Sequence, residues 1–142
     1  LLPLAHVVKV NEDELRLLTG DEHPETGSAA LLAEGPALVV VTLGARGSAF
    51  HSAAAAGFVP AFPVATVDAI GCGDAFMAGV LVGLLGVGDK SWPQRLDGVH
   101  LGHILRTANA VGALTATRPG ALPALPTAAE VEAFLQTTNA DR

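Results

Sequence analysis

The sequence predicts an α/β fold in which helices cover a sheet on both faces. Half of the 142 residues are apolar, which is enough for one compact domain or one lobe of a larger fold. Residues 37–44, ALVVVTLG, form a continuous β-branched run of the kind found in buried strands. Cores built mainly from Ala, Gly, Val and Leu are typical of layered α/β folds rather than of half-exposed sheets.

The N-terminal half is predicted to be rich in strands. Asn11 can cap a helix whose third residue, Glu14, completes a capping box, and Gly20 ends that helix. A short second helix is expected near Ala29–Glu34. The expected strands and extended segments lie between turn residues and cover 6–10, 37–44, 48–52 and 57–64, of which the last contains prolines that suit a sheet edge.

The C-terminal half is predicted to be helical. A helix rich in small residues is expected over Ala75–Leu85, and a longer one over Val99–Thr117, because apolar residues recur there at helical spacing. Residues 118–127 contain three prolines and are expected to form a stiff loop. Thr127 can cap a last helix, with Glu130 in the capping-box position three residues later.

Composition excludes several classes of protein. The net charge is −6 and no Lys/Arg cluster is present, so nucleic-acid binding is not expected. No apolar run reaches the roughly 20 residues that span a bilayer, so no membrane partner is expected either. Cys72 is the single cysteine of the sequence, so an internal disulfide is excluded. Together with the lack of a recognisable signal peptide, this predicts a cytoplasmic location. The chain begins with Leu-Leu-Pro-Leu and no Met, so we expect a fragment.

Residues 67–77, VDAIGCGDAFM, carry the clearest chemical signal. The glycines at 71 and 73 allow successive amide groups to point into one concavity, to which the following helix adds its unpaired amides and positive dipole end. Asp74 lies at the rim of this predicted anion hole, where a carboxylate can accept a proton from a hydroxyl. Phosphoryl transfer to an alcohol needs this combination. The simpler alternative is a glycine turn with a helix cap.

This stretch resembles the signature of the ribokinase-like, PfkB-type carbohydrate kinases, whose usual form is D-T-T-G-A-G-D-A-F-x-A-G. The chain departs from the signature at Ala69, Ile70 and Cys72, and it retains Asp68, Gly71, Gly73, Asp74, Ala75, Phe76, Ala78 and Gly79. Three other segments resemble further family motifs in the family's order: VKVNEDELRLLTG, VVVTLGARGS and ANAVGALTATRPGALPALPT. The resemblance implies that residues 1–142 are the C-terminal, nucleotide-binding and catalytic part of one kinase domain. The implied fold is a three-layer α/β/α fold with a mainly parallel sheet.

The resemblance implies ATP-dependent phosphorylation of a sugar hydroxyl. Asp74 would take the proton from the sugar, and the backbone amides of Gly71–Gly73 would hold the transferring phosphoryl group. Asn11 and Glu14 would organise Mg²⁺ and phosphates, largely through water. From the residues alone, Asn11 and Glu14 are better explained as a capping box, and a Glu14 folded back on the backbone is less free to hold water.

The resemblance also implies one group of residues that binds the nucleotide and another that binds a cation. Thr42 and Gly44 would border the phosphates at the end of the central strand, while Gly47 and Asn109 would lie near the ribose and adenine. A helix-surface amide is the simpler account of Asn109. Many members of the family hold a monovalent cation, and the matching positions are the Asp68 side chain and the carbonyls of Ile70, Thr115, Arg118 and Gly120. Ala124 stands where the family often has a serine, so potassium binding is left open.

Cys72 stands where the family usually has alanine. Its side chain is small enough to leave the loop amides in place. Its position at a helix N-terminus could lower the pKa of its thiol. A neutral replacement for alanine is the simpler interpretation.

The resemblance covers nearly the whole chain but only the C-terminal half of such kinases. The other half supplies the lid and most of the sugar contacts, so we expect this chain to be inactive alone and to need that half as its partner. A homodimer is also among the assemblies that the resemblance allows. Fructokinases look most similar, followed by ribokinase and 2-keto-3-deoxygluconate kinase. The alternatives are a vitamin kinase acting on hydroxymethylpyrimidine or pyridoxal, and a non-catalytic nucleotide-binding or assembly module.

Overall fold

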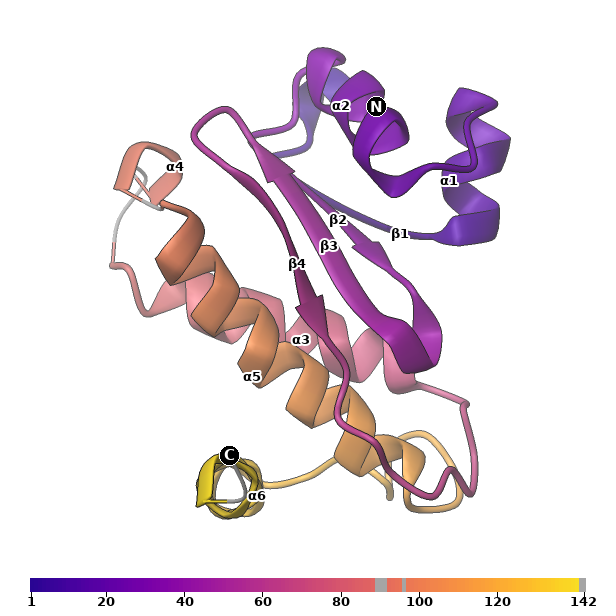
Figure 1. Cartoon of the computed structure of the whole chain (residues 1–142), viewed down its shortest axis with the longest axis vertical. Coiled ribbons are helices and arrows are strands. Elements are labelled where there is room, and N and C mark those ends of the chain that lie inside the picture. Colours follow the sequence, from indigo (N-terminus) through magenta and orange to yellow (C-terminus); the bar gives the residue numbers. More distant parts are fainter. Residues whose placement is uncertain (89–91, 96, 141–142) are drawn as a thin grey trace.

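The computed structural model describes residues 1–88, 92–95 and 97–140. Its sheet has four strands in the order β1 (Val7–Asn11), β2 (Leu38–Thr42), β3 (Gly47–Ser52) and β4 (Ala56–Pro60) (Figure 1). The expected α/β fold is confirmed. Among the described strands, the parallel arrangement expected for the sheet is present only between β1 and β2. The β2–β3 and β3–β4 pairs are antiparallel, because short connections join these strands directly.

Helices cover both faces of the sheet. On one side lie α1 (Glu12–Thr19) and α2 (Pro24–Ala33), and on the other α3 (Cys72–Leu85) and α5 (Gly98–Ala116) run side by side (Figure 1). Outside α5 packs α6 (Ala128–Ala140). The remaining elements are short: η1 (Leu2–Leu4), η2 (Gly44–Arg46) and α4 (Trp92–Arg95). These layers are the α/β/α arrangement that the sequence predicts.

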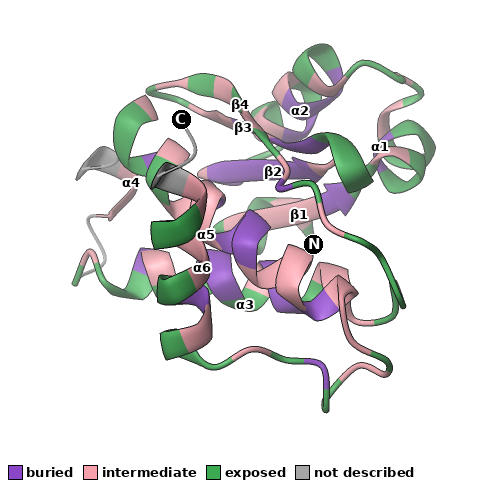
Figure 2. Ribbon diagram, turned by 60° about the horizontal axis from the view of Figure 1, so that its bottom comes forward, coloured by how far each residue is buried: buried purple, intermediate pink, exposed green. Residues whose placement is uncertain are grey.

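The strand β2 is the buried centre of the sheet (Figure 2). Leu38 and Val40 belong to the cluster that contains α3 and α5 residues, whereas Val39 and Val41 belong to the cluster with α1 and α2. Successive side chains of a strand point to opposite faces, so a strand covered on both sides needs apolar residues at every position. The continuous run in residues 37–44 is therefore explained by the two helical layers.

Helix boundaries differ from the expected ones mainly at the N-terminal ends. The helix α2 begins at Pro24 rather than near Ala29, because proline is favoured at the first helical position. The helix α3 begins at Cys72 rather than Ala75, so part of the glycine loop belongs to its first turn. The helix α5 begins at Gly98, where the Asp97 side chain accepts the amides of Val99 and His100. No sequence signal predicted the short helix α4.

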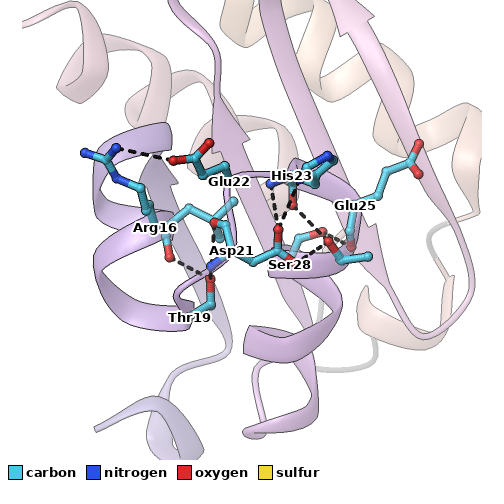
Figure 3. A network of polar contacts seen from close by, with 9 residues as sticks. Arg16, Thr19, Asp21, Glu22, His23, Glu25 and Ser28 are labelled. Carbon is cyan, nitrogen blue, oxygen red and sulfur yellow. Dashed lines mark hydrogen bonds and ion pairs between the residues drawn. The ribbon is translucent and has the colours of Figure 1, made fainter.

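Polar contacts fix the connection between α1 and α2 (Figure 3). The Thr19 hydroxyl donates to the Leu15 carbonyl at 2.8 Å and accepts the Asp21 amide at 3.1 Å. The Asp21 carboxylate accepts the His23 amide at 2.8 Å. Because these bonds hold the short segment between the two helices, α1 and α2 are kept on the same face of the sheet.

The helix α3 exposes part of its apolar surface. Leu81, Val82 and Leu85 are exposed, whereas Val80 and Leu84 are buried in the core. The strand β1 lies at one end of the described strand order, so its outer edge has no paired strand among the described residues. No helix in the described part of the chain has the length and apolar character needed to cross a membrane.

The helix α6 begins at the predicted capping box. The Thr127 amide donates to Glu130 Oε2 at 2.7 Å, and the Glu130 amide donates to Thr127 Oγ1 at 3.3 Å. The Arg118 guanidinium also contacts the Glu130 carboxylate. The Thr127 amide, followed by Arg118, lowers the pKa of Glu130 to about 2. One carboxylate therefore joins the proline-rich loop to α6.

The lowered pKa predicts how acid affects this junction. Because Glu130 has a lower pKa in the folded than in the unfolded chain, its contribution to stability is present above pH 4.5 and is lost as the pH falls toward about 2. We expect Glu130→Gln to melt at a lower temperature than the wild type near neutral pH, with a difference that shrinks toward pH 2. Thermal unfolding across this range checks the prediction. A difference that does not change with pH would contradict it.

Candidate active site

A cavity of about 620 Å³ lies at the carboxyl ends of β1 and β2. Residues from several parts of the chain line it. They include Asn11 at the end of β1, Thr42 at the end of β2, Phe62 after β4, Cys72 and Gly73 at the start of α3, and Asn109 in α5. Ligands of open α/β sheets bind beyond the carboxyl ends of the strands. The cavity has the position and size of a small-molecule site.

The glycine loop enters α3 through a left-handed residue. Gly71 has φ 79° and is the N-cap of the helix. A Cβ atom at Gly71 would lie 2.9 Å from the Ala121 Cβ, so both the backbone angle and the space there favour glycine. Cys72 and Gly73 follow in the first turn, where helix amides lack intrahelical partners, although the Cys72 amide donates to the Ala69 carbonyl at 3.3 Å. The turn at Gly71 and the start of α3 are where the sequence places the anion hole, and phosphoryl binding by these amides stays a prediction.

Asp74 lies in the first turn of α3 and is exposed. It is not among the residues that line the cavity, whereas the neighbouring Gly73 is. The carboxylate therefore stands beside the glycine loop but outside the cavity itself. In this position a carboxylate can accept a proton from a group that approaches from outside the cavity.

Asn11 and Glu14 form the capping box that the residues predicted. The Glu14 amide donates to Asn11 Oδ1, and the Asn11 amide donates to Glu14 Oε2, both at 2.8 Å. Asn11 lines the cavity and Glu14 does not. Among the described residues, no group of three or more His, Cys, Asp or Glu side chains could hold a metal ion. A metal role for this pair stays a prediction.

All four residues expected to bind nucleotide line the cavity: Thr42, Gly44, Gly47 and Asn109. The Asn109 side chain is buried, and its amide nitrogen donates to the carbonyls of Val59 and Pro60 at 3.1 and 3.2 Å. It therefore ties α5 to the end of β4 and is not the surface amide of the simpler interpretation. Contact between Asn109 and an adenine stays a prediction.

The sequence did not point to the segment after β4 as part of the site. Ala61, Phe62, Pro63, Val64 and Thr66 all line the cavity. The Phe62 ring packs edge-on against Phe134 of α6 at a centroid distance of 5.1 Å, with the Arg106 guanidinium 4.8 Å from its centroid. These are ordinary apolar residues without a chemical motif, so only their place in the fold identifies them.

Ser48 is a second polar residue that the sequence did not single out. Its side chain is fully buried, and its hydroxyl has no hydrogen-bond partner among the described residues. Ser48 is paired with Thr42 in the sheet, so both side chains lie on the same face at the carboxyl end of β2. A buried hydroxyl without a partner is costly, and this one lies next to a cavity-lining residue.

Asp68 joins the loop before α3 to the loop that follows α5. Its Oδ1 accepts the Ile70 amide and its Oδ2 accepts the Gly120 amide, each at 2.9 Å. The Ile70 amide, followed by the Gly120 amide, lowers the pKa of the Asp68 carboxyl. Three of the five residues expected to hold a cation, Asp68, Ile70 and Gly120, are therefore linked by hydrogen bonds of the Asp68 carboxylate.

Thr115 and Arg118, whose carbonyls are the other two expected cation ligands, contact each other at the end of α5. The Thr115 carbonyl accepts the Arg118 amide at 3.2 Å, and the Arg118 side chain contacts Glu130. Ala124, at the position where the family often has a serine, is fully buried. Cation binding at this cluster stays a prediction.

Cys72 is partly buried, and its thiol lies 3.7 Å from the Asp68 carbonyl. Burial, and after it the charge of Asp68, raises the pKa of the thiol. The proposed lowering of this pKa by the helix N-terminus is therefore wrong, because desolvation and a nearby carboxylate outweigh the helix dipole. A neutral replacement for alanine is the interpretation that agrees with the structure.

The raised pKa predicts that Cys72 is a slow nucleophile, because the thiolate is the reactive form. We expect iodoacetamide to alkylate Cys72 more slowly near neutral pH than it alkylates a cysteine in a short peptide. Asp68→Asn, which removes the negative charge, should shift the pH dependence of alkylation toward lower pH. Mass spectrometry of the labelled residue across a pH series measures both effects. Faster alkylation than in the peptide would contradict the prediction.

Comparison with known proteins agrees with this geometry. Residues 1–128 match the pfkB family carbohydrate kinases. Probable fructokinase-4 of Arabidopsis thaliana is 38% identical over 133 residues, which are 93% of this chain and 40% of that protein. The chain thus spans about 40% of the length of the curated relatives it matches.

Two solved structures extend the comparison. Fructokinase from Xylella fastidiosa with bound ATP has a TM-score of 0.86 at 32% identity, over 97% of this chain and 44% of that one. A double mutant of fructokinase from Vibrio cholerae O395, bound to fructose, ADP and potassium ion, has a TM-score of 0.81 at 37% identity, over 94% and 42%. The family match covers most of the chain, and the chain therefore belongs to the pfkB family of carbohydrate kinases.

Proposed function

We propose that this chain is the nucleotide-binding and catalytic part of an ATP-dependent sugar kinase that acts on fructose or a similar sugar. One observation carries the proposal: the loop Gly71–Gly73 opens α3 beside the cavity, with Asp74 in the first helical turn. An anion hole next to a carboxylate base suits phosphoryl transfer to an alcohol. The fructokinases among the relatives support fructose as the first substrate to test.

In the proposed reaction the terminal phosphoryl group of ATP moves to a sugar hydroxyl. The bond from phosphorus to the ADP oxygen breaks, a bond from phosphorus to the sugar oxygen forms, and the hydroxyl proton goes to Asp74. The amides of the glycine loop stabilise the charge on the phosphoryl oxygens. Thr42, Gly44 and Gly47, which line the cavity, suit the phosphates and ribose of the nucleotide.

The donor atoms beside the cavity fit a magnesium ion that keeps most of its water. Asn11 and Glu14 are exposed oxygen donors, but each already accepts the other's amide, so contact through water suits them better than direct coordination. Mg²⁺ would neutralise charge on the nucleotide phosphates. The fructokinase structure that contains a potassium ion makes a monovalent cation worth testing. The site that we propose for it is the cluster around Asp68, where loop carbonyls do not depend on particular side chains.

Replacing the proposed base tests the mechanism in a complete kinase that contains this chain. Asp74→Asn keeps the shape of the side chain but removes its ability to take the proton. We expect kcat to fall by about 10²–10⁴-fold with nucleotide affinity nearly unchanged, measured by coupled ADP release and by calorimetric titration. An unchanged kcat would contradict the catalytic role of Asp74 and favour a non-catalytic nucleotide-binding module. Activity on a hydroxymethylpyrimidine or pyridoxal in place of sugars would favour the vitamin kinase.

The 142-residue chain alone should show no sugar-dependent ATP turnover. Its cavity contains the donor-side residues, but Asp74 is exposed and the chain spans only about 40% of its relatives. A panel of sugars that includes fructose, ribose and 2-keto-3-deoxygluconate, assayed for ADP release, checks this expectation. Robust sugar-dependent turnover by the chain alone would refute it.

A further inference from the structure

Ser48 differs from the other buried polar side chains in having no hydrogen-bond partner. Ser28, Asn109 and Thr115 are also buried, and each donates a hydrogen bond to a backbone carbonyl. In the part of the chain that the structure describes, the Ser48 hydroxyl is the one buried side-chain oxygen or nitrogen without a partner. Such a hydroxyl costs free energy, and a partner that becomes available when a ligand binds would offset this cost.

Ser48 lies behind Thr42, on the cavity side of the sheet. The two residues are paired across β2 and β3, and Phe50, two residues after Ser48, belongs to the core cluster that contains α3 and α5 residues. Side chains two residues apart in a strand face the same side, so Ser48 and Thr42 both point toward that helical layer. Thr42 lines the cavity, whereas Ser48 does not and is fully buried. A ligand in the cavity therefore reaches the Ser48 hydroxyl only through a neighbour.

The strand pairing brings the hydroxyl groups of Thr42 and Ser48 near each other. The Leu43 amide donates to the Gly47 carbonyl at 2.8 Å, so the adjoining pair of Thr42 and Ser48 exchanges no backbone hydrogen bonds of its own. Side chains of such a pair lie closer together than those of a hydrogen-bonded pair, and Thr and Ser hydroxyls can bond across the strands. Side-chain rotation is the movement that this bond needs.

Thr42 has a hydrogen bond that it can exchange for another. Its hydroxyl donates to the Val10 carbonyl at 3.3 Å, which is longer than the about 2.7–2.8 Å usual for a hydroxyl donor. A hydroxyl group has a single proton, so Thr42 must give up this bond in order to donate to a phosphate oxygen in the cavity. Its oxygen can then still accept a hydrogen bond, and the Ser48 hydroxyl is an unused donor on the paired residue.

We propose that Ser48 is a positioning residue for the nucleotide. When Thr42 donates a hydrogen bond to a phosphate oxygen, the Ser48 hydroxyl donates to Thr42 Oγ1 and holds the Thr42 side chain in that rotamer. The inference rests on the proposed function, in which Thr42 borders the nucleotide phosphates, and it adds the residue that orients Thr42. Two hydroxyl donors in series strengthen each other's hydrogen bonds, and Ser48 gains the partner that it lacks.

Nucleotide binding by Ser48→Ala, in a complete kinase that contains this chain, tests the proposal. We expect ADP and the ATP analogue AMP-PNP each to bind about fivefold more weakly, which is the effect of one lost hydrogen bond. The KM for ATP should rise to a similar extent, whereas kcat and the KM for sugar should change less than about twofold. Unchanged binding of both nucleotides would overturn the proposal.

Ser28→Ala is the matched control. Ser28 is also buried, but it lies in α2 on the other face of the sheet, and its hydroxyl donates to the Glu25 carbonyl at 3.1 Å. The control should bind both nucleotides as the wild type does. It should also melt at a lower temperature, because it loses a hydrogen bond that the folded chain contains.

Stability separates a positioning role from a purely structural one. Ser48→Ala removes a hydroxyl that has no partner before the nucleotide binds. The melting temperature of the nucleotide-free kinase should therefore stay the same or rise, and the increase on adding ADP should be smaller than in the wild type. A lower melting temperature without nucleotide would mean that Ser48 already has a partner, such as a buried water, and would overturn the proposal.

A double-mutant cycle with Thr42→Val tests whether Ser48 acts through Thr42. Thr42→Val keeps the branched shape of the side chain and removes its hydroxyl. In this background Ser48→Ala should change ADP binding less than about twofold. A weakening of about fivefold in both backgrounds would overturn the role through Thr42.

Binding of ADP needs no sugar, so the measurements on Ser48 do not depend on the sugar that the kinase accepts. A wild-type kinase that binds nucleotides but phosphorylates no sugar would refute the proposed function, and the binding data would still decide the role of Ser48. A wild type that binds neither ADP nor AMP-PNP would refute both.

Discussion

The carboxylate of Asp68 holds together the two loops on which the candidate active site depends. It accepts the amides of Ile70 and Gly120, which are fifty residues apart in the sequence. The amides of Val67 and Asp68 in turn donate to the Ala116 carbonyl at the end of α5. The left-handed turn at Gly71 is therefore placed by fixed contacts on both sides. An anion hole is effective only when its amides are oriented before the reaction begins.

The sheet sets the second boundary of the site. Asn11 and Thr42 are the last residues of β1 and β2, they are paired in the sheet, and both line the cavity. Because β1 and β2 are parallel, their carboxyl ends meet at the edge of the sheet beside the start of α3. The antiparallel strands β3 and β4 then return the chain to the same edge through Ala61 and Phe62. The cavity is thus enclosed by strand ends, the glycine loop and α5.

Local signals in the sequence were sufficient for much of this architecture. The capping boxes at Asn11 and Thr127 and the buried strand β2 depend on neighbouring residues, and the structure confirms all three. Features that depend on distant contacts were not predictable in the same way. The pKa of Cys72 rises mainly because the folded chain buries the thiol, and Phe62 lines the cavity while its ring packs on Phe134 of α6. Neither the burial of Cys72 nor the packing of Phe62 on α6 can be predicted from the neighbouring residues in the sequence.

The position of Asp74 agrees with the proposed division of the site into a nucleotide side and a sugar side. Gly73 lines the cavity, but the next residue is exposed on its outer side. If Asp74 is the proposed base, the hydroxyl must reach it from outside the cavity, because Asp74 is not among the residues that line the cavity. The same helix exposes Leu81, Val82 and Leu85 further along. A helix that carries an exposed carboxylate at its start and exposed apolar residues toward its end is suited to contact further protein. Under the proposed function, that protein would bring the sugar to Asp74.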